Sequence, residues 1–316
     1  EGTDAVNKDQ LDEVAATAEN TRKYFQASGS EDSDAGALAE GDSALAAGEA
    51  ANAIGDGATA LGGGATAIAA QATALGYNSL ATGENASAVG TNAQASGSDS
   101  AALGSGAVAS ETSTTATGAG AQATAVYSTA NGAEAVASGA QSLSSGFRAA
   151  ASADGATAVG GYSEASGRLG SALGYGTVAS GANSTAAGVF ATATGAGAVA
   201  VGEASEATGD ESVAIGGSTY FGLITSRASG YGASAYGAGA WATEDYATAI
   251  GWNAWADGAQ STALGASATA NGSNSVALGA ASQADRDNTV AVGSDGNERQ
   301  VTHVAAGTED TDAVNV

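Results

Sequence analysis

Residues 198–216 read AVAVGEASEATGDESVAIG and contain one short pattern three times. Glycine recurs every seventh residue, at Gly202, Gly209 and Gly216. Alanine stands two residues before each glycine, and alanine or serine stands four residues before it. Because successive side chains of a strand point to opposite faces, this alternation predicts a short β-strand in every heptad, with one uniformly small face.

The same register runs through most of the chain. From Gly41 to Gly293, 30 of the 37 positions at this spacing are glycine, and the exceptions are Ala69, Glu111, Ala125, Ala153, Leu223, Glu244 and Arg286. Alanine stands two residues earlier in 35 of the 37 heptads, all but those of Ser144 and Phe221. A coiled coil also repeats every seven residues, but it needs bulky residues at two positions, and each glycine costs a helix about 1 kcal/mol. The repeat therefore predicts strands.

Each heptad is interpreted as a strand of about five residues followed by a turn, in which glycine accepts the positive φ of a tight bend. Two heptads make one coil of a flattened solenoid, and Ala, Ser and Thr fill its thin interior. The composition agrees, because 49 Gly and only 5% aromatic residues leave few side chains for a wide core. The predicted fold class is an all-β parallel β-roll.

The outward positions differ between alternate heptads. Some carry apolar pairs, such as Val199 with Val201, whereas the intervening ones carry polar pairs, such as Glu206 with Thr208. A long apolar stripe is unstable in water, so it predicts self-association with closed symmetry. The residues predicted to lie in this interface are Val89, Leu103, Val159, Leu173, Val199, Val201, Val213, Ile215, Ile250, Leu264, Val276, Leu278, Val290 and Val292. Thr117, Asn131 and Ser145 interrupt the stripe, and looser or wetter packing is predicted there.

A different heptad pattern occupies the N-terminal residues. Asn7, Leu11, Val14 and Ala18, followed by Thr21 and Phe25, are spaced alternately by four and three residues. This spacing predicts the seam of a short coiled coil. A single amphipathic helix docked on the roll is the alternative.

The chain resembles the trimeric autotransporter adhesins. Their head heptads are similar to SVAIG at residues 212–216 and SVALG at 275–279, and their neck connector is similar to ERQVTHVAAG at 298–307 followed by TDAVN at 311–315. TDAVN also stands at residues 3–7. The resemblance implies a left-handed roll, three copies around one axis, and a neck joining each head to a coiled-coil stalk. It also implies a bacterial cell-surface location, with anchoring in the outer membrane through a C-terminal β-barrel outside this sequence.

These features divide the chain into three predicted regions. Residues 1–27 are the end of a neck and a short stalk, 28–293 are the β-roll head, and 294–316 are a second neck connector. Within the head, the apolar alternation is interrupted between Ile215 and Ile250, which lie five heptads apart and so leave one surplus heptad. A protruding irregular loop is predicted at residues 217–230.

Aromatic residues gather close to the predicted loop. Tyr220, Phe221, Trp241, Trp252 and Trp255 are the candidate ligand contacts, and Trp241 and Trp255 occupy the same outward position one coil apart. Exposed aromatic rings combine a broad apolar area with polar edges, which suits recognition. The alternative is that these rings only cover the loop.

The composition argues against catalysis and nucleic-acid binding. The chain has no Cys and one His, His303, so a conventional zinc site or thiol nucleophile cannot be assembled from one chain. No catalytic, cofactor-binding or metal-binding residue is predicted. The net charge of −25 repels nucleic acid and anionic lipid.

The predicted function is that of an adhesin head. Its predicted partners are other copies of itself, in a homotrimer, and host extracellular matrix proteins or cell-surface glycans. A structural spacer that projects another binding domain is the alternative. Ice binding is disfavoured because the polar outward positions lack a repeating Thr pair.

Overall fold

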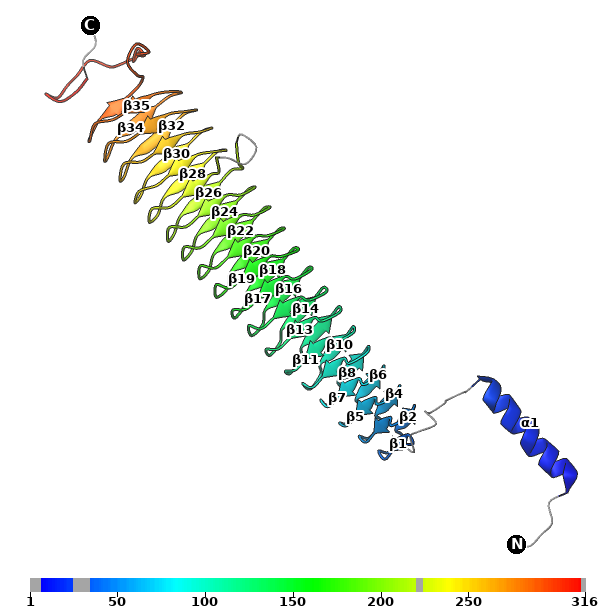
Figure 1. Cartoon of the computed structure of the whole chain (residues 1–316). Helices are drawn as coiled ribbons and strands as arrows, with labels where there is room; N and C mark the ends of the chain where they lie inside the picture. Colours follow the sequence, from blue (N-terminus) through cyan, green and yellow to red (C-terminus); the bar gives the residue numbers. More distant parts are fainter. Residues whose placement is uncertain (1–6, 25–34, 220–223, 314–316) are drawn as a thin grey trace. The chain divides into compact units, whose positions relative to one another are not determined.

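The computed structural model describes residues 7–24, 35–219 and 224–313, with the side chains of 22–24 left aside. The chain divides into two compact units, residues 1–113 and 114–316. In each unit successive strands stack into a parallel β-solenoid with two heptads per coil, and helix α1 (Lys8–Tyr24) precedes the strands of the first unit (Figure 1). The predicted parallel solenoid and its repeat are confirmed.

In the first unit the strands form two sheets, here named sheet A and sheet B. Sheet A contains β1 (Leu38–Ala39), β3 (Asn52–Ala53), β5 (Thr66–Ala67), β7 (Leu80–Ala81), β9 (Gln94–Ala95) and β11 (Val108–Ala109). Sheet B contains β2 (Leu45–Ala47), β4 (Thr59–Leu61), β6 (Thr73–Leu75), β8 (Ser87–Val89) and β10 (Ala101–Leu103). Each strand pairs in parallel with the strand two heptads away, as Thr59 does with Thr73.

The second unit repeats this arrangement. Its sheet A contains β13 (Gln122–Ala123), β15 (Val136–Ala137), β17 (Ala150–Ala151), β19 (Glu164–Ala165), β21 (Val178–Ala179), β23 (Thr192–Ala193), β25 (Glu206–Ala207), β27 (Arg227–Ala228), β29 (Trp241–Ala242), β31 (Trp255–Ala256), β33 (Thr269–Ala270) and β35 (Gln283–Ala284). Its sheet B contains β12 (Thr115–Thr117), β14 (Thr129–Asn131), β16 (Leu143–Ser145), β18 (Thr157–Val159), β20 (Ser171–Leu173), β22 (Thr185–Ala187), β24 (Val199–Val201), β26 (Val213–Ile215), β28 (Ser234–Tyr236), β30 (Thr248–Ile250), β32 (Thr262–Leu264), β34 (Val276–Leu278) and β36 (Val290–Ala291).

Alanine fills the interior of each solenoid. In sheet B of the second unit, Ala172, Ala186 and Ala200 stack in register and are fully buried. Buried serine and threonine occupy further inward positions, such as Ser205 and Ser212, whose hydroxyls donate to the carbonyls of the preceding turn. Because the inward side chains are small, the two sheets lie close together and no wide core is needed.

The strands are shorter than predicted, with two or three residues instead of about five. The turns take up the remaining residues, because each turn holds a residue with positive φ, such as Ala204 at 51° and Glu211 at 57°. Left-handed backbone cannot continue a strand ladder. None of the non-glycine residues at such positions is β-branched, in keeping with the steric cost of that conformation.

The two turns of a coil use glycine differently. In the turn from sheet B to sheet A, here the BA turn, glycines such as Gly160, Gly174 and Gly188 have φ of 129°, 134° and 134°. In the opposite AB turn, Gly139 and Gly181 avoid positive φ. The heptad exceptions Ala69, Glu111, Ala125, Ala153, Glu244 and Arg286 all fall in the AB turn. Only the BA turn therefore requires glycine for its backbone conformation, whereas the heptad pattern suggested the same role in both.

The surplus heptad is inserted between β26 and β27. Glu206 of β25 pairs with Arg227 of β27, a separation of three heptads where other coils have two. An antiparallel bridge joins Thr219 to Ile224. Residues 220–223, which include the candidate contacts Tyr220 and Phe221, lie outside the described residues. Strand β27 occupies Arg227–Ala228 within the predicted segment 217–230, so the regular coil resumes there.

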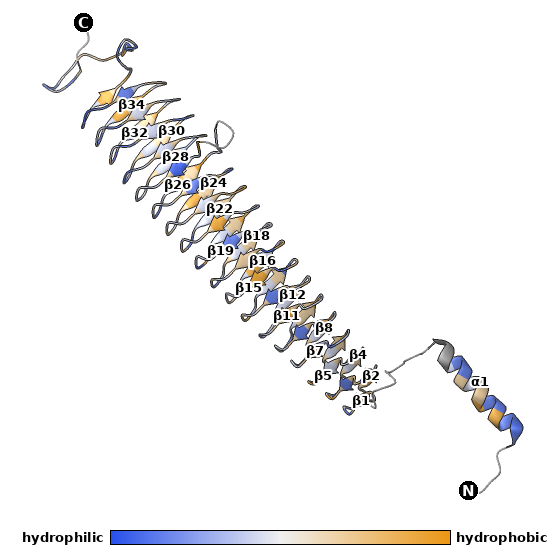
Figure 2. Cartoon of the chain, in the orientation of Figure 1, coloured by the Kyte–Doolittle hydropathy of each residue, from blue (hydrophilic) through white to orange (hydrophobic). Residues whose placement is uncertain are grey.

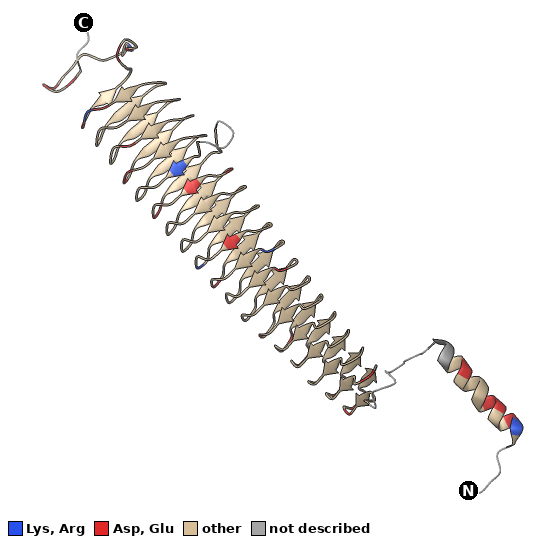
Figure 3. Cartoon of the chain, viewed as in Figure 1, with Lys and Arg blue, Asp and Glu red and all other residues tan. Residues whose placement is uncertain are grey.

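Apart from those on helix α1 and in the segment after β36, most charged residues lie in the turns (Figure 3). Among the described strand residues only Glu164, Glu206 and Arg227 are charged. Several turn carboxylates bridge neighbouring coils, since Asp154 and Asp210 accept hydrogen bonds from the amides of Ala140 and Ala196, one coil earlier. Some of the acidic residues therefore serve as hydrogen-bond acceptors for turn amides that have no strand partner.

Candidate functional site

The predicted interface residues all lie on sheet B, or directly after it in the case of Val292. Val89, Leu103, Val159, Leu173, Val201, Ile215, Ile250, Leu264 and Leu278 hold the last outward position of their strands, and Val199, Val213, Val276 and Val290 hold the first. The strands carry both hydrophilic and hydrophobic residues (Figure 2), and the predicted interface residues lie on most of the sheet B strands from β8 to β36. Those at the last position are partly covered by their neighbours in the column but remain accessible, for example Val201 at 37% and Leu278 at 44%.

Sheet A has a mixed outer surface. Its outward residues include Glu164, Gln94 and Thr192. Directly after β3 and β5, Ile54 and Ile68 are also exposed, at 40% and 44%. The contrast between an apolar and a polar sheet is therefore weaker than the heptad comparison suggested. Sheet B of each unit has a mostly apolar column at its last outward position. In the second unit the first three rungs are the polar Thr117, Asn131 and Ser145, as the sequence indicates.

Two of the candidate contact residues stack directly on sheet A. The indoles of Trp241 and Trp255 lie 5.0 Å apart with an angle of 8° between their planes. The Trp241 Nε1 donates to the carbonyl of Thr225 at 2.8 Å, and the Trp255 Nε1 donates to Oδ1 of Asn253 at 3.2 Å. Trp252 lies in the BA turn and is 46% exposed, so it belongs to a different surface.

On helix α1 the predicted seam residues are exposed. Leu11 and Val14 are 62% and 65% exposed, and Ala18 is exposed as well. Asn7 is the N-cap, because its Oδ1 accepts from the Gln10 amide at 2.9 Å while Gln10 Oε1 accepts from the Asn7 amide at 3.1 Å. The seam therefore begins at a capping residue, and its coiled-coil pairing remains a prediction.

A column of four aromatic rings in the BA turns was missed by the sequence interpretation. Phe147, Tyr162, Tyr175 and Phe190 make successive edge-to-face contacts, with centroids 5.3, 5.6 and 5.6 Å apart. The rings are 43%, 45%, 50% and 56% exposed. In the sequence these residues are 15, 13 and 15 residues apart, alternately one more and one fewer than the 14 residues of a coil.

The neighbouring coils hold this column in place. A Cβ on Gly176 would lie 2.7 Å from the ring of Phe190, so glycine provides the room that the ring occupies. At the other end Arg148 lies over Phe147, 5.1 Å from the ring centroid. Arg148 also donates to Oε2 of Glu134 at 2.6 Å, and this hydrogen bond raises the pKa of Arg148.

Replacing Tyr175, one of the two inner members of the column, is expected to destabilise the second unit. Tyr175→Ala removes two edge-to-face contacts, each contributing about 0.5–1.5 kcal/mol, and should lower the free energy of unfolding by about 1–3 kcal/mol. Urea unfolding followed by circular dichroism measures the change. Tyr77→Ala is the matched control, because Tyr77 holds the same turn position and is 62% exposed. Equal losses in both variants would contradict a stabilising role for the column.

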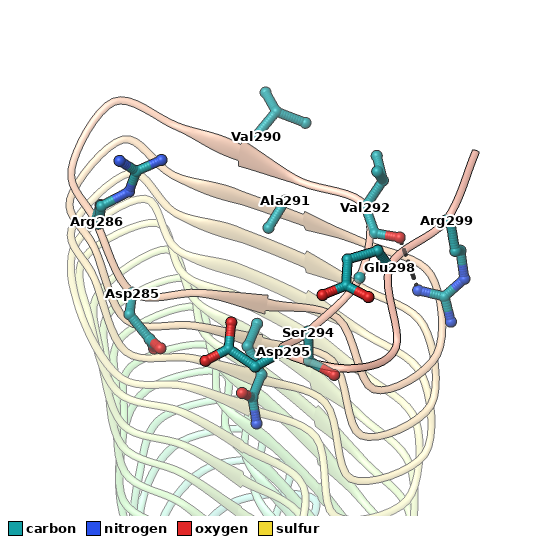
Figure 4. A pocket seen from close by; sticks show the side chains of 11 residues that line it. Asp285, Arg286, Val290, Ala291, Val292, Ser294, Asp295, Glu298 and Arg299 are labelled. Atoms are coloured by element: carbon teal, nitrogen blue, oxygen red, sulfur yellow. Dashed lines mark hydrogen bonds between the residues drawn. The ribbon is translucent and has the colours of Figure 1, made fainter. Parts of the chain in front are cut away.

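A pocket lies at the last coil of the second unit (Figure 4). Its volume is about 320 Å³, and Asp285, Arg286, Val290, Glu298 and Arg299 are among its lining residues. Arg299 fastens the segment after β36, since its guanidinium donates to the carbonyl of Val292 at 2.9 Å, to Ser282 Oγ at 2.8 Å and to the carbonyl of Ala280. Hydrogen bonds from the amides of Glu298 itself and Gly296 lower the pKa of Glu298.

Neither a metal site nor a membrane helix is found in the described parts of the chain. Among these residues no three His, Asp or Glu side chains converge as metal ligands would. Helix α1, the helix within the described ranges, is too short and too polar to span a bilayer.

Comparison with known proteins was made for sequence families and for solved structures. A family described as the YadA head domain repeat, in two copies, matches residues 39–65, 53–79, 81–107, 109–135, 137–163, 165–191, 193–219, 228–254, 256–282 and 270–295. The gap after residue 219 coincides with the inserted heptad. No curated protein matches the chain.

Among solved structures, the chain is similar to the collagen-binding domain of the Yersinia adhesin YadA. The two are 34% identical, the match covers 57% of this chain and 80% of that one, and the TM-score is 0.36. The family matches extend over most of residues 39–295 and follow the two-heptad coil described above. The chain therefore belongs to the YadA head domain family, whose members are non-enzymatic adhesin heads.

Proposed function

We propose that this chain is the head of a homotrimeric adhesin on the bacterial cell surface, and that it attaches the cell to host extracellular matrix or cell-surface glycans. The apolar column of sheet B is the observation that carries the trimer. Side chains such as Ile215, Leu264 and Leu278 keep 39–44% of their surface accessible in the single chain. Burying that remainder between copies gives about 1 kcal/mol per residue, and the column repeats along the sheet.

Three copies of the column around one axis bury one identical stripe per chain with closed symmetry. Exposed Leu11 and Val14 on α1 support the same assembly, because they need partners of the same kind in a coiled coil. Residues at the end of the second unit, 294–316, are then proposed to connect the head to the following stalk.

Solution mass provides the direct test of assembly. The purified chain is expected at three times its single-chain mass of 29.5 kDa in multi-angle light scattering. Chemical crosslinking should give a limiting trimer band. A monomer at micromolar concentration by both methods would overturn the trimer.

Adhesion is tested on the same trimer. The chain should bind at least one member of an immobilised panel of collagen, fibronectin, laminin and cell-surface glycans, and bacteria displaying it should adhere to that surface. The solenoid also suits a structural spacer, because its regular coils would project another domain. A stable trimer that binds nothing in the panel and confers no adhesion would favour the spacer.

A further inference from the structure

Trp255 sits on a fixed aromatic support. One face of its indole stacks on Trp241, with 5.0 Å between centroids and 8° between planes. Trp241 is itself held by the hydrogen bond from its Nε1 to the carbonyl of Thr225, at 2.8 Å. Trp255 Nε1 donates to Asn253 at 3.2 Å. The second indole is thus oriented by a ring beneath it and by a hydrogen bond at its edge.

The segment with the inserted heptad supplies the carbonyl group that holds Trp241. Thr225 follows directly on Ile224, which is bridged to Thr219. The same pair packs on the adjacent BA turn, where a Cβ on Gly239 would lie 3.0 Å from Thr219 Oγ1 and 3.2 Å from the Ile224 side chain. The one irregular coil among the described residues therefore ends against Trp241 and fixes its orientation.

A small pocket lies beside Trp255, toward the next coil. Its volume is about 230 Å³, and it is lined by Asn253, Trp255, Ser267 and Thr269. Thr269 of β33 is the register partner of Trp255, and Asn253 and Ser267 are the left-handed residues of two successive BA turns. All four side chains are partly buried. An aromatic ring is thus placed next to one amide and two hydroxyl groups.

This combination has a specific chemical complement. The apolar C–H face of a pyranose stacks on an indole, while its ring hydroxyls exchange hydrogen bonds with amide and hydroxyl side chains. The volume of about 230 Å³ is sufficient for about one sugar ring and is below the range of larger ligand sites. No basic side chain lines the pocket, and the chain has a net charge of −25, so carboxylated and sulfated sugars are disfavoured.

We propose that Asn253, Trp255, Ser267 and Thr269 form a subsite for one neutral pyranose ring of a cell-surface glycan. The proposal deepens the adhesin function proposed above and rests on it for its biological setting. Trp255 provides the stacking platform, Asn253 and the two hydroxyl residues select the orientation of the ring, and Trp241 positions Trp255 without contacting the sugar.

Saturation-transfer NMR on the purified chain tests the subsite. The probes are the methyl glycosides of glucose, galactose, mannose and N-acetylglucosamine, with N-acetylneuraminic acid as the anionic comparison. Signal transfer is expected to at least one neutral glycoside and not to the acid. Trp255→Ala should abolish it, and Thr269→Val, which keeps the shape but removes the hydroxyl, should weaken binding by about five- to tenfold, the loss expected for one hydrogen bond.

Trp252→Ala is the matched control, because Trp252 is an exposed indole three residues away that does not line the pocket. It should bind like the wild type. Failure of every neutral glycoside, unchanged transfer in Trp255→Ala, or equal losses in both Trp variants would overturn the subsite. If Trp255→Ala misfolds by circular dichroism, Thr269→Val decides the matter alone.

The result is separable from the adhesin proposal. A trimer that adheres to matrix proteins but shows no transfer from any sugar removes only this subsite. Sugar binding by a chain that stays monomeric leaves the subsite standing and removes the trimer.

Discussion

The double variant Val201→Asp, Ile215→Asp is expected to be a monomer in solution. Both residues lie in the sheet B column and are paired in register on β24 and β26. In the proposed trimer the change places six carboxylates against one another at a shared apolar axis, where an unpaired buried charge is costly. The dissociation constant should rise at least 100-fold, equivalent to about 3 kcal/mol. Sedimentation equilibrium over a range of concentrations measures it.

The matched control places the same two charges on the other sheet. Both substituted residues are outward residues of sheet A: Thr192 is the first residue of β23, and Thr208 comes directly after β25. Thr192→Asp, Thr208→Asp should remain trimeric, with the mass of the wild type. If this control dissociates equally, or if the sheet B variant keeps its mass, the interface lies elsewhere.

The second large effect is expected from one glycine of the BA turn. Gly146 has φ of 142°, and an added Cβ would lie 2.5 Å from the carbonyl oxygen of Gly160. Gly146→Ala should lower the free energy of unfolding by about 2–4 kcal/mol, because strained backbone and overpacking each cost about 1–3 kcal/mol. Urea unfolding at fixed protein concentration measures this loss.

Gly139→Ala in the neighbouring AB turn is the control. A Cβ there would also approach the next coil closely, 1.9 Å from the Ala153 carbonyl oxygen, so close approach alone does not separate the two turns. The equivalent positions one coil before and one coil after Gly139 are already alanine, Ala125 and Ala153. The AB turn therefore accommodates the methyl group. Its stability should stay within about 1 kcal/mol of the wild type. Equal losses would show that φ is not the deciding factor.

Several features of the fold could be predicted from the sequence because they depend on neighbours at fixed spacing. The heptad with alanine two residues before glycine determines strands, a two-heptad coil and an alanine interior. The five heptads between Ile215 and Ile250 likewise reveal a surplus heptad, which the structure places between β26 and β27. The stacking of Trp241 on Trp255 follows from their separation by one coil.

The heptad glycines of the BA and AB turns have different roles, which the sequence interpretation did not distinguish. All the non-glycine heptad residues that the structure describes lie in the AB turn, so the sequence itself contains the distinction. The positive φ of the BA glycines gives its physical reason. The aromatic column of Phe147, Tyr162, Tyr175 and Phe190 escaped notice because its spacing alternately exceeds and falls short of the coil repeat by one residue. Neither spacing is the coil repeat itself. The rings meet because Tyr162 and Phe190 occupy the left-handed position of their turns, whereas Phe147 and Tyr175 occupy the position directly before it.

By itself the sequence determined the strand order, the inward alanines and the apolar column, because a regular repeat makes each residue's neighbours a matter of counting. The tertiary structure decided which turn needs glycine, how the inserted heptad ends against Trp241, and that Trp255 borders a pocket with Asn253, Ser267 and Thr269. These depend on backbone angles and on the stacking of one coil on the next. Such geometry is set in three dimensions and has no fixed spacing along the chain.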